Sequence, residues 1–164
     1  MNKLLLEANF TEFRNYYEKG IPFALISAFQ GDVDVSQNKK NNVTLRKKIR
    51  EQGYSMIKIS GKYVESDDYY ENMIVFCNDS SRYKEFVRFL LFFGKHYYQN
   101  SIIVVDADSN IWEYATRQNS TIGAIGTKKR YDKFLNKSNN EIENLVRMFT
   151  TRTYELDYVR LVTD

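Results

Sequence analysis

Acidic side chains that could do chemistry lie at the ends of two predicted strands. Glu65 closes one strand and Glu71 opens the next, so a tight hairpin would hold both carboxylates at one end of a sheet. Paired carboxylates can divide acid and base roles or bind a divalent ion. A solvated acidic turn explains the same pattern, because Asp67 and Asp68 lie between them. Nothing else in the sequence supplies a metal cage, and neither a metal nor a cofactor is expected.

The stretch GKHYYQNSII (94–103) holds further polar groups where a predicted helix ends and an apolar strand begins. Gln99 and Ser101 either satisfy the last carbonyl groups of the helix or face a pocket. His96, the only histidine, lies on the flank of the apolar stripe of the helix. A single histidine excludes a multi-histidine metal site.

Two asparagines share a helical face with core residues. Asn38 and Asn42 align with Leu45 and Ile49, and amides in such positions need hydrogen-bond partners. Either this turn of helix extends beyond the sheet into solvent, or it forms a polar pocket. Ser27, among large apolar neighbours, would face the same region or bond locally to backbone. The candidate polar pocket therefore comprises Ser27, Asn38, Glu65, Glu71, Gln99 and Ser101.

Basic residues form two groups that could contact nucleic acid or phosphate. One group, which includes Lys47 and Lys48, runs along a predicted helix, and the other follows GAIG (123–126) as Lys128, Lys129 and Arg130. Flexible glycine backbone followed by cations can hold phosphate. A charge run on a helix is, however, usually a solvated face. The net charge of +3 and pI of 8.8 are milder than those of a dedicated nucleic-acid binder.

The elements that must position these residues follow the order strand, helix, strand, strand, helix, strand. Helix 37–52, capped by Ser36, follows the first strand, and a second helix follows residues 78–81. The strand over 23–29 is apolar on both faces and is therefore expected at the centre of the sheet. Right-handed crossovers and paired middle strands favour an α+β, ferredoxin-like βαββαβ sandwich with an added hairpin strand. The expected strands span 23–29, 54–65, 71–77, 101–107 and 111–116.

Segments at both ends extend this unit. A short helix over 3–19 and a basic C-terminal extension (119–164), with a helix at 140–150 and a strand at 153–162, are expected, and either would cover the free face of the sheet. With 164 residues, we expect one domain with its core at about 20–118. Cys77 is the only cysteine, which excludes an internal disulfide and fits a reducing compartment. The three leucines near the start are too few for a signal peptide or membrane helix.

Several stretches in one order resemble a family of small uncharacterised proteins of tailed bacteriophages, which is similar to a bacterial domain-of-unknown-function family. They are LISAFQG, GYSMIKISGKYVE, ENMIV and GKHYYQNSIIV, within about residues 23–116. The resemblance implies a viral or mobile-element origin, a compact α/β domain and a location in the host cytoplasm or in the virion. It selects the polar positions Ser27, Asn38, Tyr63, Glu65, Glu71, Lys95, Gln99 and Ser101.

The function that follows is a phage-type accessory binding protein that engages a host protein, a nucleotide or nucleic acid. The absence of a specific catalytic motif, the small size and the basic groups favour it; no membrane partner is expected, and the oligomeric state stays open. One alternative is a small hydrolase or transferase acting on a phosphate-bearing substrate. In that enzyme Glu65, Glu71 and Gln99 would supply acid/base and positioning roles, and Asn38 and Lys95 would hold substrate. Another alternative is a minor virion component.

Overall fold

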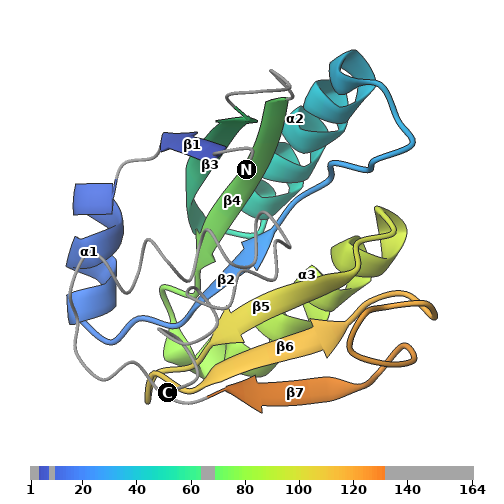
Figure 1. Cartoon of the computed structure of the whole chain (residues 1–164). Helices are drawn as coiled ribbons and strands as arrows, with labels where there is room; N and C mark the ends of the chain where they lie inside the picture. Colours follow the sequence, from blue (N-terminus) through green and yellow to red (C-terminus); the bar gives the residue numbers. More distant parts are fainter. Residues whose placement is uncertain (1–3, 8–9, 64–68, 132–164) are drawn as a thin grey trace.

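The computed structural model describes residues 4–7, 10–63 and 69–131 of the chain (Figure 1). Within these residues, seven strands form one sheet in the order β1-β3-β4-β2-β5-β6-β7, and all neighbouring pairs are antiparallel. The prediction of a mixed α and β domain is confirmed. The elements are β1 (Leu4–Glu7), α1 (Phe10–Glu18), β2 (Phe23–Ile26), α2 (Val35–Glu51), β3 (Ser55–Tyr63), β4 (Tyr69–Phe76), the 3-10 turn η1 (Ser80–Arg82), α3 (Tyr83–His96), β5 (Ser101–Val105), β6 (Ile111–Ala115) and β7 (Lys128–Tyr131).

Strand β2 lies in the middle of the sheet, between β4 and β5, and contributes to two cores. Phe23 and Leu25 pack in one cluster with Phe13 of α1. Ala24 and Ile26 belong to the cluster on the opposite face, which α2 and α3 cover. All four residues of β2 are buried, so the prediction of a central strand covered on both sides is confirmed. Helix α1 covers the face away from α2 and α3, as predicted for the N-terminal helix.

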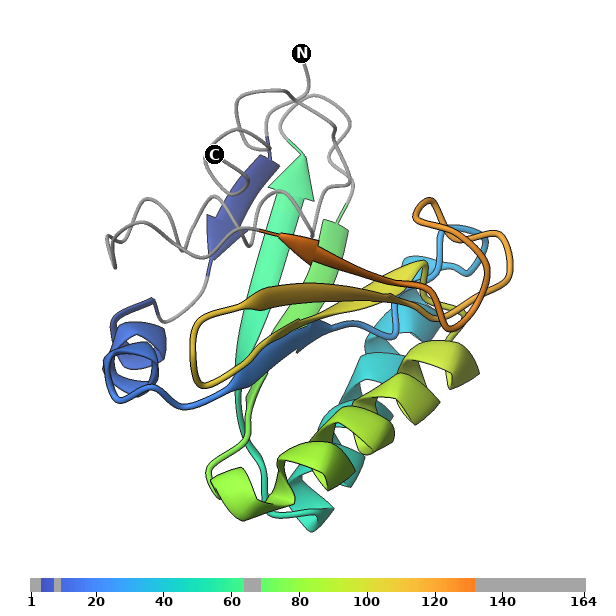
Figure 2. The same cartoon turned by 90° about the horizontal axis from the view of Figure 1, so that it is seen from below.

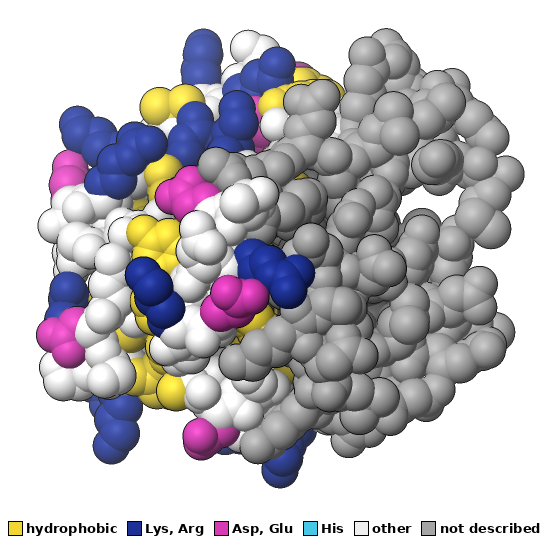
Figure 3. Space-filling view, turned by 90° about the vertical axis from the view of Figure 1, so that its left-hand side faces the viewer, with side chains coloured by type: hydrophobic (Ala, Val, Ile, Leu, Met, Phe, Trp, Pro, Cys, Tyr) yellow, Lys and Arg dark blue, Asp and Glu magenta, His cyan; other side chains and the backbone are white. Residues whose placement is uncertain are grey.

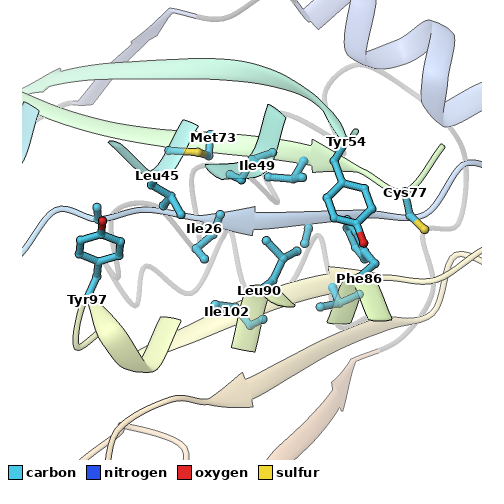
Figure 4. Packing of buried hydrophobic residues seen from close by; sticks show 14 residues of the cluster. Ile26, Leu45, Ile49, Tyr54, Met73, Cys77, Phe86, Leu90, Tyr97 and Ile102 are labelled. Atoms are coloured by element: carbon cyan, nitrogen blue, oxygen red, sulfur yellow. The ribbon is translucent and has the colours of Figure 1, made fainter. Parts of the chain in front are cut away.

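Helices α2 and α3 lie side by side against one face of the sheet (Figure 2). Their inner stripes repeat every four residues, with Leu45 and Ile49 on α2 and Phe86 and Leu90 on α3, and all four side chains are fully buried. Figure 4 shows them gathered near Ile26 of β2. The apolar stripe read from the sequence therefore marks the faces that bind these helices to the sheet.

The last turn of α3 approaches the sheet closely at Gly94. A Cβ atom on this residue would lie 2.9 Å from the Cγ2 atoms of Ile102 and Thr116, which is closer than real Cβ contacts. The absence of a side chain here brings the end of α3, and the polar junction that follows it, against the start of β5.

The N-terminal region differs from the helix predicted over 3–19. Residues Leu4–Glu7 form β1, which pairs with β3 in the register Leu4↔Tyr63, and α1 begins only at Phe10. A run of three leucines fits a strand as well as a helix, and the pairing partner lies far along the chain. Local pattern alone could not decide between the two.

The connection between β2 and α2 also differs from the prediction. The strand predicted over 23–29 ends at Ile26, so that Ser27 begins a loop. Helix α2 starts at Val35, and its cap is Asp34, not Ser36, because the Asp34 side chain accepts a hydrogen bond from the Gln37 N–H at 2.8 Å. The middle hairpin β3–β4 and the added hairpin β5–β6 lie where they were predicted.

Strand β7 lies within the segment predicted to be a polar, basic extension. Its Lys128, Lys129 and Arg130 side chains are exposed, so it lacks the alternation that marks a strand. The helix predicted at 140–150 and the strand predicted at 153–162 lie outside the described residues. Among the helices that the structure describes, none has the length and hydropathy needed to cross a membrane.

Candidate functional site

A cavity of about 410 Å³ opens where β2 ends. Its walls come from β2 and the loop after it, from β4, from the junction between α3 and β5, and from the loop after β6. The lining combines apolar side chains with amides, hydroxyls and two charged groups. The lining residues are Leu25, Ile26, Ser27, Phe29, Gln30, Gly31, Asp32, Asn72, Tyr98, Gln99, Asn100, Ser101, Ile103 and Arg117.

The two buried asparagines of α2 hold the loop that borders this cavity. Asn42 accepts a hydrogen bond from the Ala28 N–H at 2.8 Å. Asn38 accepts one from the Gln30 N–H at 3.0 Å and donates to the carbonyl oxygens of Gln30 and Val33 at 2.9 and 3.1 Å. These amides meet backbone groups that no strand pairs, which satisfies the backbone and Asn38, whereas Asn42 Nδ2 is buried without a partner among the described residues. Neither predicted alternative, solvent or an open polar pocket, describes them.

Two further side chains bind the same loop from other elements. The Ser27 hydroxyl donates to the Glu71 carbonyl oxygen at 2.6 Å and accepts from the Phe29 N–H at 3.0 Å. Gln99 donates from Nε2 to the Phe29 carbonyl oxygen at 2.8 Å and to the Tyr97 carbonyl oxygen at 3.2 Å. Side chains from three parts of the fold therefore fix residues 27–30.

A buried carboxylate lies next to this loop. Glu71 is 4% exposed and forms an ion pair with Arg46, with 3.2 Å between Oε1 and Nη1. Its other oxygen accepts a hydrogen bond from the Tyr69 hydroxyl at 2.9 Å. Burial, and then the bond to Glu71, raise the pKa of Tyr69, so the phenol stays protonated and donates. The Tyr69 ring lies 6.1 Å from that of Phe29, which lines the cavity.

A second buried carboxylate lies behind the part of the cavity wall formed by β5. Glu113 of β6 is 1% exposed and accepts hydrogen bonds from the hydroxyls of Ser101 and Tyr131. Since Ser101 lines the cavity, Glu113 is one hydrogen bond removed from it. An acid at a core-facing position of the alternating strand IWEYA is a signal that could have identified this residue from the sequence.

The loop after β6 completes the cavity with Arg117. Thr116 donates from its hydroxyl to the Gln99 carbonyl oxygen and from its backbone N–H to the Asn100 carbonyl oxygen. The Asn100 side chain accepts from the Thr121 N–H at 2.8 Å and donates to the Thr121 hydroxyl at 2.9 Å. No sequence pattern marks Arg117, because only these long-range contacts bring it to the cavity.

The predicted pocket residues are distributed around one loop. Ser27, Gln99 and Ser101 line the cavity, whereas Asn38 holds the loop that borders it and Glu71 joins the loop through its backbone. Glu65 lies outside the described residues. Lys95, the predicted substrate-holding cation, is exposed on α3 and is absent from the cavity lining.

The predicted phosphate contacts do not line this cavity. Lys47 and Lys48 lie exposed on α2, where Lys48 forms an ion pair with Glu51 at 3.8 Å, and the other three lie on β7, which is far from α2 in Figure 1. Lys128 and Arg130 lie over the Trp112 ring. On the face drawn in Figure 3, Lys and Arg side chains are interspersed with acidic and uncharged ones.

His96 is exposed at the end of α3 and stacks on Phe92, as expected for a flank residue. The described ranges contain no group of three or more His, Cys, Asp or Glu side chains that could hold a metal ion.

Comparison with known proteins gives one result. The model of the S-adenosylmethionine lyase family matches residues 24–155. No curated protein and no solved structure matches the chain. The matched range begins in β2 and includes every residue that lines the cavity.

Proposed function

The chain belongs to the S-adenosylmethionine lyase family, and we propose that it cleaves a carbon–sulfur bond of S-adenosylmethionine in the cavity at the end of β2. The observation that carries the proposal is the family match over residues 24–155, since that range contains the whole cavity lining.

The family corrects the function predicted from the sequence. A binding protein that acts without turnover was expected, and membership of a family named for an enzyme overturns that expectation. The enzyme alternative agrees better with the family. S-adenosylmethionine carries a sulfonium, an amino acid and an adenosine but no phosphate, so the exposed basic residues of α2 and β7 are not needed to bind it.

The size and lining of the cavity support this substrate. A volume of about 410 Å³ lies within the range of small-molecule sites, roughly 300–1,000 Å³. Leu25, Phe29 and Ile103 offer apolar surface for an adenine ring. The side-chain amides of Asn72 and Gln99 offer hydrogen bonds for ribose or purine groups.

The reaction removes a positive charge from the substrate. When a carbon–sulfur bond of a sulfonium breaks without water, the electron pair stays on sulfur and the positive charge is lost. Either a base removes a proton from the adjacent carbon, whose C–H electron pair then forms a carbon–carbon double bond, or another group of the same substrate attacks the carbon and forms a ring. Glu71, held by Arg46 and Tyr69, is the candidate base for the first route, because its carboxylate is buried and fixed in position beside the cavity loop, although it is not among the lining residues.

Turnover tests the proposal directly. The purified protein is mixed with S-adenosylmethionine in water enriched in ¹⁸O, and early products are separated and weighed by mass spectrometry. We expect an adenosine-containing thioether to accumulate and the first-formed products to carry no ¹⁸O, because a lyase adds no water. Intact substrate after prolonged incubation would refute the proposal, and ¹⁸O in the earliest product would make the protein a hydrolase.

Two finer predictions stay part of this proposal. Four neighbouring strands in the order β3-β4-β2-β5, with α2 and α3 on one face, support a ferredoxin-like assignment for the central unit. Origin in a tailed bacteriophage and action in the host cytoplasm also stay predictions, and removal of the host's S-adenosylmethionine would be a use for such an enzyme.

A further inference from the structure

We infer that Arg117 binds the α-carboxylate of the substrate and makes the cavity selective for ligands that carry an amino acid. The inference deepens the proposed function and rests on it. It assigns the amino-acid part of S-adenosylmethionine to the side of the cavity formed by the loop after β6.

The first observation is an unsatisfied cation. Arg117 lines the cavity, and its Nε is buried with no hydrogen-bond partner in the part of the chain that the structure describes. A buried N–H of a guanidinium that lacks a partner costs free energy, which a ligand oxygen would recover. Because Arg117 lines the cavity, a ligand held there is one source of the missing acceptor.

The second observation is the way in which the guanidinium is held. It lies over the Tyr98 ring, 5.4 Å from the ring centroid. A guanidinium held over an aromatic ring keeps N–H groups with which it can bind a carboxylate through two parallel hydrogen bonds. Tyr98 takes up this position with a φ of 53°, a left-handed conformation that is uncommon for a tyrosine.

The surrounding loop holds both residues in place. The Tyr98 hydroxyl donates to the Asn119 side chain at 3.3 Å, and the Ser120 N–H donates to the Arg117 carbonyl oxygen at 3.2 Å. With the two bonds between Asn100 and Thr121, these contacts join the junction after α3 to the loop after β6. Arg117 is therefore positioned before a ligand arrives, which lowers the entropy lost on binding.

The third observation is charge complementarity. Among the lining residues that the structure describes, Arg117 and Asp32 are the only charged ones. One cation and one anion match the two charges of an amino acid, with the α-carboxylate at Arg117 and the α-ammonium toward Asp32. Adenosine alone carries neither charge and would leave both side chains without a ligand partner.

Binding of two probes tests the inference without any need for turnover. S-adenosylhomocysteine keeps the amino acid, whereas 5′-methylthioadenosine keeps the adenosine and the thioether but lacks it. Affinities of the full chain and of Arg117→Gln are measured by calorimetry. We expect the substitution to weaken S-adenosylhomocysteine by about 10- to 100-fold, the usual effect of losing hydrogen bonds to a charged group. The affinity for 5′-methylthioadenosine should change by less than about twofold, because a ligand without the carboxylate makes none of these hydrogen bonds.

Two further variants keep the outcomes distinct. Arg88→Gln removes an exposed arginine of α3 and should leave both affinities unchanged. Arg117→Lys keeps the charge and should recover part of the S-adenosylhomocysteine affinity while confirming that position 117 tolerates substitution. Equal weakening of both probes by Arg117→Gln, or no weakening of either, overturns the inference while the proposed function stands. If the wild-type protein binds neither probe nor S-adenosylmethionine, the proposed function fails and the inference fails with it.

Discussion

At the scale of single residues, Glu71 is buried and has two hydrogen-bond donors, one charged and one neutral. Arg46 supplies a positive charge and Tyr69 supplies a neutral donor, so the carboxylate is fixed without being exposed to water. Replacing Glu71 by Gln keeps its shape and one of its two acceptor oxygens but removes its charge. We expect kcat for S-adenosylmethionine cleavage to fall by about 100-fold, in the range typical of losing a positioned acid–base group.

The control for Glu71 is Glu85→Gln. Glu85 is exposed on α3 and pairs with Arg82 at 3.0 Å, far from the cavity lining, so its loss should leave kcat unchanged. Initial rates with saturating substrate measure both variants, and circular dichroism checks their folding. A Glu71→Gln protein that folds and keeps the full rate would remove this carboxylate from the chemistry.

Asn38 illustrates a different role, because it binds backbone and does not line the cavity. Replacement by Ala removes the hydrogen bonds to Gln30 and Val33 and leaves polar backbone groups without partners. We expect the free energy of unfolding to fall by about 1–3 kcal/mol, measured by urea denaturation, and KM to rise as the loop loosens. Asn41→Ala is the matched control: this asparagine of α2 accepts a hydrogen bond from the exposed Gln37 side chain, and a change of more than about 0.5 kcal/mol there would contradict the argument.

The candidate site could be predicted from the sequence only in part. Ser27 and Gln99 stand out because polar side chains beside apolar strands need partners, and both are found at the cavity. The sequence pattern does not show whether such a side chain faces a ligand or a loop, since a ligand and a loop backbone can each supply its hydrogen-bond partner. Arg117 escapes prediction for another reason: it lies in a polar loop with no periodicity, and contacts made across the fold bring it to the site.

At the scale of elements, the contact between α3 and the sheet depends on Gly94. Alanine is favoured over glycine in a helix by about 1 kcal/mol, but its Cβ would lie 2.9 Å from Ile102 and Thr116. Overpacking of this kind costs about 1–3 kcal/mol, so the clash outweighs the propensity. We expect Gly94→Ala to lower the urea midpoint and to weaken ligand binding, because Thr116 anchors the loop that carries Arg117.

The comparison for Gly94 is Gly31→Ala. A Cβ atom on Gly31 would meet no atom within 4 Å, and this glycine has no positive φ, so its substitution should leave the urea midpoint unchanged or raise it slightly. A stabilised Gly94→Ala protein would show that the helix can shift away from the sheet at little cost.

Elements with a strong apolar pattern were predictable, and those defined by pairing were not. The buried faces of β2, α2 and α3 follow from runs and stripes of apolar residues that need no partner to be recognised. Strands β1 and β7 lie at the two edges of the sheet, and each is defined by the neighbour with which it pairs. Their short sequences, LLLE and KKRY, fit several conformations equally well.

At the scale of the whole molecule, buried phenols make the fold sensitive to high pH. Burial raises the pKa of Tyr54, Tyr83, Tyr97 and Tyr114, most strongly for Tyr83. In the unfolded chain these groups titrate near pH 10, so above that pH the unfolded state holds fewer protons than the folded state. The free energy of unfolding should therefore be unaffected by these groups below pH 10 and should fall as the pH rises beyond it.

Urea unfolding at pH 9 and pH 11 measures this effect, and ultraviolet absorbance of tyrosinate follows the titration itself. Tyr83→Phe removes the group with the largest shift and should make the decline between the two pH values shallower. Equal stability at both pH values would show that the phenols reach solvent without unfolding.

The fixing of residues 27–30 by Asn38, Asn42 and Gln99 has a consequence for how mutational scans of this protein should be interpreted. A library selected only for activity would rank the two asparagines with the groups that touch substrate, because losing either kind lowers activity. A second selection for abundance of folded protein separates them, since loop-holding positions fail both screens whereas Arg117→Gln should fail only the first. The same confusion would affect any comparison across related sequences that equates invariance with catalysis.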